Sequence, residues 1–322
     1  PDDNFWKNKI ESAWKLRLSL GFDNNAETNV FRLIHGEGDG LPGLIVDFYN
    51  GTAVMQSHSV GMYLVREKLV KALCEVLGDK LIAVYDKSEK SLPFKAGVES
   101  KDGYLFGEHK DREVLENGLR FKVDWLEGQK TGFFIDQREN RHLVQHYSAG
   151  RDVLNMFCYT GGFSFYAMKG NAQMVHSVDS SAKAIELTNQ NVALNFLNDT
   201  RHEAFVGDAF EFMRDIKSKY DLIILDPPAF AKHRDALHQA LQAYKRINTR
   251  AFEQIRSGGI LFTFSCSQVV SKEKFREAVF SAAAIAKRNV RILHQLTQPA
   301  DHPVNIYHPE GEYLKGLVLY VE

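Results

Sequence analysis

The chain has 322 residues, 44% of them hydrophobic, so it is long enough for two domains that each bury a core. Its 40 lysines and arginines nearly balance its 41 aspartates and glutamates, which excludes a global positive field that would draw the whole protein onto nucleic acid. No apolar stretch reaches the ~18 residues of a membrane span, and the N-terminus lacks the pattern of a secretory signal. We therefore expect a cytoplasmic protein.

The first half of the chain predicts a lead-in helix followed by a small α/β domain. Apolar residues at near-helical spacing predict the helix at 5–17. Short runs of β-forming residues at 31–34, 43–49 and 52–57 predict strands, and Asn50-Gly51 predicts a hairpin turn between the last two.

The pattern continues with one more helix and two more strands. The helix is expected at about 61–78, and the strands at 81–86 and 119–126. The polar segment 87–118 is predicted to be irregular.

A glycine-rich segment, Glu127–Gly132, marks the expected domain junction. The predicted parts are a lead-in helix and linker (1–28), a small α/β domain (29–130) and a larger C-terminal domain (131–322).

In the C-terminal domain, apolar β-runs alternate with amphipathic helices. This alternation predicts an α/β, Rossmann-like fold with a mostly parallel, doubly wound sheet of seven strands. Because no helical pattern separates the last two strands, we expect the final strand to be antiparallel. The strands are expected at about 152–157, 174–179, 202–207, 221–226, 258–265, 289–296 and 312–321.

The loop after the first of these strands reads Cys158-Tyr159-Thr160-Gly161-Gly162. In parallel sheets a nucleotide binds beyond the carboxyl ends of the strands, where glycine allows a close backbone approach. An ordinary tight strand-to-helix turn explains such a loop equally well.

The next two strands also end in acids. Asp179 lies 18 residues after Gly161 and can accept both ribose hydroxyls, while Asp208 can accept a hydrogen bond from an adenine amino group. Either could instead be a helix cap, a role that Ser180 could share. The Gly-x-Gly-x-x-Gly pattern that seats a pyrophosphate is absent, so S-adenosylmethionine, which has no phosphate, suits the site better than NAD.

Two further strand ends carry the candidate chemistry. The fourth strand ends in Asp226-Pro227-Pro228-Ala229-Phe230, a stiff turn that can present a carboxylate and a stacking surface to a planar base. A proline-terminated strand with a solvated acid is the alternative. The fifth strand ends in Ser265-Cys266-Ser267, where a thiolate can reach a bound base.

The other two cysteines fit other roles. Cys74 lies in a predicted helix and fits a small buried hydrophobe, and Cys158 fits a wall of the cofactor pocket. The cysteine spacings match neither a disulfide framework nor a zinc site.

Five motifs together resemble the bacterial 23S ribosomal RNA cytosine-5 methyltransferases of the PUA-plus-methyltransferase family, which are class I methyltransferases. The similarity covers nearly the whole chain from about residue 30, and the set is specific although each motif alone is not. The motifs are Gly38-x-Gly40-Leu41-Pro42-Gly43-Leu44, Thr131-Gly132-Phe133-Phe134-x-Asp136-x-Arg138, Asn155-x-Phe157-x-Tyr159-Thr160-Gly161-Gly162, Asp226-Pro227-Pro228-x-Phe230 and Ser265-Cys266-Ser267.

The resemblance implies methyl transfer from S-adenosylmethionine to carbon 5 of a cytosine, with S-adenosylhomocysteine as product. Cys266 would add to carbon 6 and Asp226 would hold or supply a proton at N3, while the base that removes the C5 proton is not identified. The residues expected around the cofactor are Asp136, Arg138, Asn155, Phe157, Tyr159, Thr160, Gly161, Asp179, Ser180, Asp208, Ala209, Asp226 and Pro227. For Asp136 and Arg138, helix capping and a salt bridge are the alternative.

The expected partner is ribosomal RNA, most simply 23S, in single-stranded or flipped-out form. The segment 229–256 has a local net charge of +4 from six basic and two acidic residues, although a solvated helix face is the commoner explanation for such a charge. The residues expected to contact the substrate are Pro228, Phe230, Lys232 and Arg246.

Several features of the family remain open for this chain. Because the chain begins at Pro1, we expect it to start inside a longer product or to lack the family's PUA module. The central domain is expected to help form an RNA groove. His302 and His308 are expected at a polar hairpin tip; no metal is expected, and a homodimer is left open.

Two other functions remain as alternatives. One is methylation of another RNA atom such as guanine N7, which needs no thiol because a ring nitrogen is already nucleophilic. The other is a catalytically inactive, RNA-binding relative.

Overall fold

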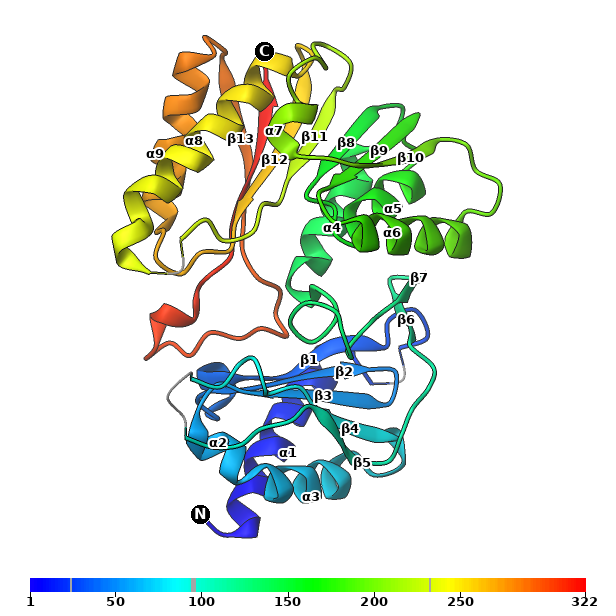
Figure 1. The fold of residues 1–322 in the computed structure, drawn as a ribbon, viewed down its shortest axis with the longest axis vertical. Coiled ribbons are helices and arrows are strands. Elements are labelled where there is room, and N and C mark those ends of the chain that lie inside the picture. Colours follow the sequence, from blue (N-terminus) through cyan, green and yellow to red (C-terminus); the bar gives the residue numbers. More distant parts are fainter. Residues whose placement is uncertain (24, 94–96, 232) are drawn as a thin grey trace. The chain divides into compact units, whose positions relative to one another are not determined.

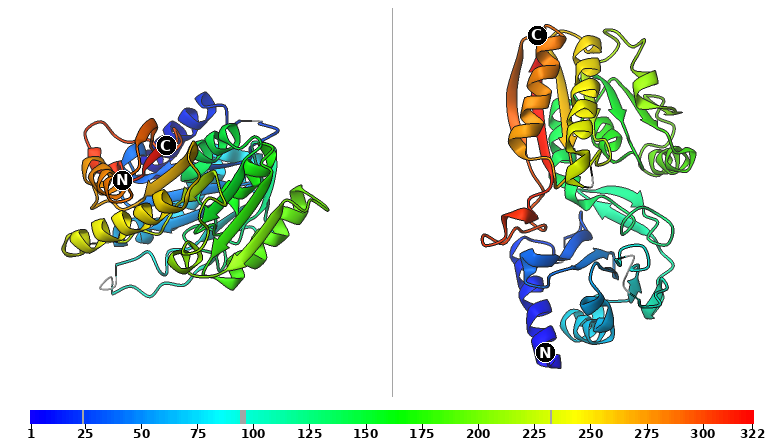
Figure 2. Two further views of the ribbon diagram at one scale, coloured as in Figure 1. Left: turned by 90° about the horizontal axis from the view of Figure 1, so that it is seen from above. Right: turned by 60° about the vertical axis from the view of Figure 1, so that its left-hand side comes forward.

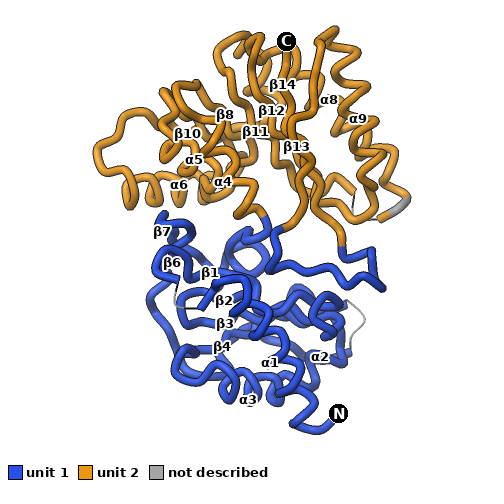
Figure 3. Tube along the Cα trace, turned by 180° about the vertical axis from the view of Figure 1, so that it is seen from behind, with its two compact units in different colours: residues 1–136, 299–311 blue, residues 137–298, 312–322 orange. Residues whose placement is uncertain are grey.

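The chain folds into two compact units, which Figure 3 shows in different colours. This computed structural model describes residues 1–23, 25–93, 97–231 and 233–322. The first unit comprises residues 1–136 and 299–311, and the second comprises 137–298 and 312–322. The boundary lies a few residues beyond the expected junction, and the sequence did not predict that residues 299–311 belong to the first unit.

The first unit is built on a five-stranded sheet of order β1-β2-β3-β4-β5 (Figure 1). The expected lead-in helix is not a separate part, because its buried face, with Trp6, Ile10 and Trp14, belongs to the core of this unit. The strands are β1 (Val30–His35), β2 (Leu44–Tyr49), β3 (Thr52–Ser57), β4 (Ala83–Asp86) and β5 (Gly103–Phe106), and the helices are α1 (Asp3–Ser19), α2 (Val60–Leu64) and α3 (Arg66–Leu77).

The hairpin between β2 and β3 is confirmed. Asn50 and Gly51 have φ of 46° and 96°, the left-handed conformation that a tight two-residue turn requires. The segment 87–118 is not irregular throughout, because it contains β5 and also β6 (Glu113–Glu116), which pairs with β7 (Leu119–Lys122). Asn117-Gly118, with φ of 49° and 74°, was the overlooked signal for this second hairpin.

Residues 299–311 are anchored in the first unit through buried polar groups. Asp301 Oδ2 accepts a hydrogen bond from Arg32 N at 3.0 Å, and the Asp301 carbonyl accepts one from Arg17 Nη2 at 2.8 Å. His302 Nδ1 lies 3.0 Å from Asp301 Oδ1, and both side chains are fully buried. The expectation of a polar hairpin tip is therefore wrong for His302. This histidine contacts Asp301, whose oxygens accept hydrogen bonds from the Arg32 backbone N–H and the Arg17 guanidinium.

The second unit holds a seven-stranded sheet of order β10-β9-β8-β11-β12-β14-β13. Strands β8 to β12 are parallel neighbours, and β14 runs antiparallel between β12 and β13, as expected. All seven expected strands are present, within about three residues of their predicted ends. They are β8 (Asp152–Met156), β9 (Met174–Asp179), β10 (His202–Val206), β11 (Leu222–Leu225), β12 (Gly259–Ser265), β13 (Val290–Leu296) and β14 (Lys315–Val321).

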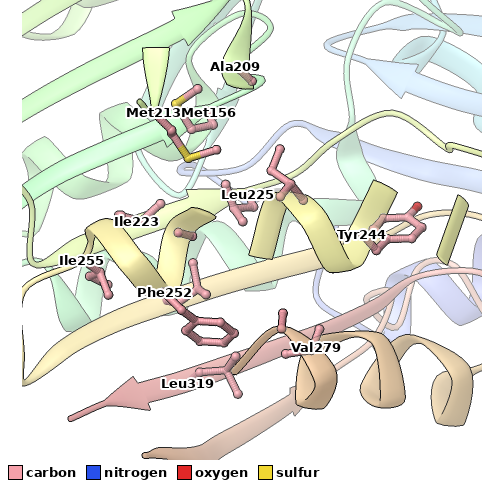
Figure 4. Packing of buried hydrophobic residues seen from close by; sticks show 14 of the residues in the cluster. Met156, Ala209, Met213, Ile223, Leu225, Tyr244, Phe252, Ile255, Val279 and Leu319 are labelled. Carbon is pink, nitrogen blue, oxygen red and sulfur yellow. The ribbon is translucent and has the colours of Figure 1, made fainter. Parts of the chain in front are cut away.

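Helices cover both faces of this sheet (Figure 2). On one face, α7 (Ala209–Phe212), α8 (Leu237–Gln254) and α9 (Lys272–Ile285) pack on β-strand side chains such as Leu225 and Leu319, as Figure 4 shows. On the other face, α4 (Arg138–Tyr147), α5 (Gly162–Lys169) and α6 (Ala182–Asn195) pack on Leu222, Ile224 and Phe262.

The strand order places a topological switch point between β8 and β11. From β8 the chain proceeds through β9 to β10 at one side of the sheet, and it then returns to β11 and continues to β12. Loops diverge at such a point and leave a crevice at the carboxyl ends of the strands, where α/β proteins bind ligands. Among the described residues, no helix is both long and apolar enough to cross a membrane.

Candidate active site

Several of the predicted site residues lie at the carboxyl edge of the second unit's sheet. Leu225 pairs with Met156 on one side and with Thr263 on the other, so the ends of β8, β11 and β12 are aligned. The turns that carry Asp226 and Cys266 therefore leave neighbouring strands on the same edge, and Asp179 and Asp208 follow β9 and β10 farther along it.

The loop after β8 has an unusual backbone. Phe157, Tyr159 and Gly161 have φ of 59°, 47° and 84°, so three residues within five positions are left-handed. Non-glycine residues in this region cost free energy, and such conformations cluster at functional sites. The loop is held in place by Asp179 Oδ2, which accepts from Tyr159 N at 2.9 Å, and by Thr188 Oγ1, which donates to the Tyr159 carbonyl at 2.9 Å.

Two acids at the strand ends accept hydrogen bonds from backbone N–H groups. The second oxygen of Asp179 accepts from Ser181 N at 2.9 Å. Asp208 is the N-cap of α7 and accepts from the N–H groups of Phe210 and Glu211. The capping role considered from the sequence is present at Asp208, whereas the N-cap of α6 is Ser181 and neither Asp179 nor Ser180. Each carboxylate oxygen has more than one lone pair and can also accept from a ligand.

Asn155 lies inside the sheet and belongs to a buried polar chain. Its Nδ2 donates to Ser164 Oγ at 2.9 Å, Ser164 Oγ lies 2.6 Å from Ser177 Oγ, and Ser177 Oγ lies 2.8 Å from His202 Nε2. These contacts join β8, α5, β9 and β10. Asn155 therefore links the elements on both sides of the loop after β8, a contact that the motif did not indicate.

The turn at Ser265–Ser267 is fixed by three side-chain hydrogen bonds. Ser265 Oγ donates to Tyr244 Oη at 2.9 Å, and Ser267 Oγ donates to the Ala231 carbonyl at 2.7 Å. Lys315 Nζ donates to the Ser267 carbonyl. The Cys266 side chain between them is half-buried, so it is neither enclosed in the interior nor fully exposed to solvent.

Tyr244 contacts both chemical turns, through its hydroxyl at Ser265 and its ring at Phe230, and was not among the residues expected at the site. Its hydroxyl is buried, and burial raises the pKa of Tyr244 to about 12 despite the hydrogen bond from Ser265. Negative charge on Cys266 and on Asp226 also raises this pKa. Both side chains therefore lie within electrostatic range of one phenol.

The other two thiols are less suited to attack a base. Cys158 is buried, and burial followed by the charge of Asp179 raises the pKa of its thiol far above the ordinary value. Cys74 lies in α3 of the first unit, and burial raises its pKa as well. A thiol must ionise to act as a nucleophile, so these environments favour Cys266.

The expected base-stacking and phosphate-binding residues differ in exposure. Pro228 is exposed, whereas Phe230 is half-buried with its ring centroid 4.8 Å from that of Tyr244. Arg246 stacks over the Phe210 ring at 4.5 Å, in a groove of the surface lined by α7 and α8. Lys232 lies outside the described residues.

Part of the positive charge of segment 229–256 is neutralised by ion pairs. Arg250 pairs with Glu253 at 3.1 Å, and Arg256 pairs with Asp152 at 2.9 Å and with Asp221 at 3.3 Å. Glu253 is already included in the net charge of +4, so it is the pairing of Arg256 with two acids outside the segment that lowers the charge available to a phosphate.

The remaining cofactor candidates are placed as follows. Pro227, Thr160 and Ala209 are buried and Ser180 is exposed. Asp136 closes the first unit and Arg138 opens α4 in the second, where its Nε lies 3.4 Å from Glu139 Oε1. Both side chains are buried.

A parallel sheet with this switch point and these acidic strand ends defines a Rossmann-like nucleoside-binding enzyme. Residues 32–306 match the family model described as S-adenosylmethionine-dependent methyltransferase, and the chain belongs to that family.

The relatives of the chain include methyltransferases of large-subunit ribosomal RNA. Ribosomal RNA large subunit methyltransferase I of Alteromonas mediterranea is 40% identical over 99% of this chain and 81% of its own length. A Streptococcus mutans structure named as a SAM-dependent methyltransferase is 24% identical, covers 100% of this chain and 82% of its own, and has a TM-score of 0.87. A methyltransferase structure complexed with SAH matches with the same TM-score, identity and coverage.

S-adenosylmethionine is therefore the cofactor, and the residues present fit it. Asp179 and Asp208 offer carboxylate oxygens to hydroxyl and amino groups, which a nucleoside carries. An acidic edge also suits a cationic sulfonium better than a pyrophosphate. At Gly207, beside Asp208, an added Cβ would meet no atom within 4 Å, so the strand end is open there.

Proposed function

We propose that this enzyme methylates carbon 5 of a cytosine in large-subunit ribosomal RNA through a covalent adduct of Cys266. The observation that carries the proposal is the half-buried Cys266 at the end of β12, beside the strand that ends in Asp226. The target RNA rests on the name of the relatives, ribosomal RNA large subunit methyltransferase I.

The proposed role of the Cys266 thiol is to activate the cytosine ring for methylation. Carbon 5 of cytosine is a poor nucleophile, so the ring must be activated by addition at carbon 6. The Cys266 thiolate forms the S–C6 bond, and the displaced ring electrons accumulate at C5 while Asp226 holds a proton at N3. A positioned carboxyl group next to the thiol is the arrangement that this step requires.

Bound S-adenosylmethionine supplies the electrophilic methyl group, and S-adenosylhomocysteine leaves with the electrons of the broken bond. After C5 has gained the methyl group, a base removes the C5 proton. The C5–H electrons then re-form the ring double bond, the S–C6 bond breaks, and Cys266 is released as a thiolate. Atoms and charge balance without any further reactant.

The target base must leave its stack to reach the sheet edge. We propose that it enters as a single-stranded or flipped-out nucleotide and stacks against the exposed ring of Pro228, with the free edge of Phe230 beside it. Arg246 and Lys232 would bind the flanking phosphates.

The test is methyl transfer from labelled S-adenosylmethionine to large-subunit RNA taken from a strain without the enzyme, followed by nucleoside mass spectrometry. We expect 5-methylcytidine with the native protein and a loss of more than about 1,000-fold with Cys266→Ala, because no other group replaces the nucleophile. Calorimetry should show that the variant still binds the cofactor.

Cys74→Ala is the matched control, because it removes a thiol from the first unit and leaves the sheet edge intact. Its activity should equal that of the native protein. Appearance of 7-methylguanosine, or full activity of Cys266→Ala, would contradict the proposal.

A further inference from the structure

Lys315 is a buried cation that the mechanism above leaves unused. It begins β14 and lies directly opposite Ser265 in the antiparallel pairing of β12 with β14. Its side chain is 6% exposed, and Nζ donates to the carbonyl of Ser267. The lysine therefore reaches both flanks of the residue that carries the proposed nucleophile.

We propose that Lys315 is a positioning residue for Cys266, which fixes the Ser265–Ser267 turn through the Ser267 carbonyl and stabilises the Cys266 thiolate by its positive charge. The inference rests on the proposed role of Cys266.

The first argument is the cost of burying an ammonium group. A buried lysine is expensive unless a nearby negative group or a set of acceptors compensates it. Burial lowers the pKa of Lys315 to about 8, and a negative charge on Cys266 raises it, so the side chain is still mostly protonated at neutral pH. Because an interaction between two ionisable groups is mutual, the ammonium must lower the pKa of the thiol.

The second argument is the surrounding charge. Lys272, at the start of α9, opposes protonation of Lys315, and Glu312, just before β14, favours it. These two side chains pair with each other and are about half exposed, at 52% and 46%. Solvent screens such a pair, so Cys266 is the partner that the buried ammonium affects most.

The test measures the rate of Cys266 alkylation by iodoacetamide against pH, with the Cys266 peptide quantified by mass spectrometry and no RNA or cofactor present. Lys315→Met removes the charge and should raise the midpoint of the alkylation profile by roughly one pH unit. Lys315→Arg keeps the charge and should return the midpoint toward the native value. Cys74, in the same molecules, is the internal reference.

Lys272→Met is the matched control, since it removes a solvated charge from the same end of the sheet and should leave the midpoint unchanged. In methyl transfer, Lys315→Met should lower kcat about tenfold at pH values below both midpoints, where the thiolate fraction falls by that factor, and it should leave cofactor affinity unchanged.

An unchanged midpoint in folded Lys315→Met protein overturns the inference. If that variant does not fold, the same measurement is made on Lys315→Gln, which keeps a hydrogen-bond donor without the charge. An unchanged alkylation midpoint in Lys315→Gln then overturns the inference. Because alkylation is read on the free enzyme, its outcome is independent of which RNA atom is methylated, so failure here and failure of the proposed function are told apart.

Discussion

The acids at the strand ends differ in what their oxygen atoms already contact. Asp179 uses both oxygens on backbone N–H groups, one of which belongs to the strained residue Tyr159. Asp208 uses one oxygen on two N–H groups of α7. A substitution at Asp179 should therefore disturb both the proposed ribose contact and the backbone of the loop after β8.

We predict that Asp179→Asn weakens S-adenosylmethionine binding roughly 10- to 100-fold, because an amide nitrogen would face a backbone N–H where a charged acceptor now lies. Isothermal titration calorimetry measures the change. Asp152→Asn is the control, since Asp152 begins β8 at the opposite edge of the sheet and pairs with Arg256. Native affinity in Asp179→Asn would argue against a ribose contact.

Among the elements, the β8–α5 connection is tightly constrained. Gly161 combines a φ of 84° with close packing, since an added Cβ would lie 2.6 Å from Phe165 Cζ and 2.7 Å from Thr188 Cγ2. The loop therefore packs closely against the helices that follow it. The connection is therefore a rigid support for the crevice.

Gly161→Ala should lower the free energy of unfolding of the second unit by about 1–3 kcal/mol, because it adds left-handed strain and a steric clash. Differential scanning calorimetry checks this. Gly207→Ala, which meets open space and does not require positive φ, should change stability by less than about 0.5 kcal/mol. Equal stability of the two variants would show that the loop adapts.

Helix α8 shows how one element serves two purposes. Its inner face, with Tyr244 and Ile247, belongs to the core, and its Tyr244 hydroxyl holds the Ser265 turn. Its outer face carries Arg246 beside Phe210. The helix therefore couples core packing to the placement of the candidate nucleophile.

At the scale of the whole molecule, buried and half-buried histidines recur in both units. Burial is the first cause of a lowered pKa at His35, His176, His202 and His302, with His35 at about 2 and His202 at about 4. The folded protein thus binds fewer protons than the unfolded chain below the ordinary histidine pKa of 6.5. Its stability is complete above that pH and falls as the pH decreases.

We predict that the free energy of unfolding falls below pH 6.5 by up to about 1.4 kcal/mol per pH unit for each such histidine. His35→Asn should reduce this slope in the first unit, because its Oδ1 can accept from Arg32 as His35 Nδ1 does without ever becoming protonated. Urea titrations followed by tryptophan fluorescence report this unit, since Trp6, Trp14 and Trp125 all lie in it.

His308→Gln is the control. This histidine belongs to the same unit as His35, but its side chain is 46% exposed. Its slope should match that of the native protein. If the free energy of unfolding falls equally steeply below pH 6.5 in His35→Asn and in the native protein, groups other than His35 cause the pH dependence.

The local pattern of the sequence determined the second unit's elements and the residues at their ends. Alternation between apolar β-runs and amphipathic helices depends only on neighbouring residues, so all seven strands were predicted, and so were the turns at Gly161, Asp179, Asp226 and Cys266. Strands β5 and β6, which lie within the polar segment 87–118, were missed because their few apolar residues do not stand out from that segment.

The tertiary structure alone decided which of these ends become neighbours and what supports them. Ser267 and Lys315 are 48 residues apart, and Arg32 and Asp301 are 269 apart, yet each pair is hydrogen-bonded. Such contacts follow from strand order and from a chain that returns to its first unit, neither of which local periodicity encodes. The sequence therefore supplied the proposed nucleophile, whereas the buried groups around it emerged only from long-range packing.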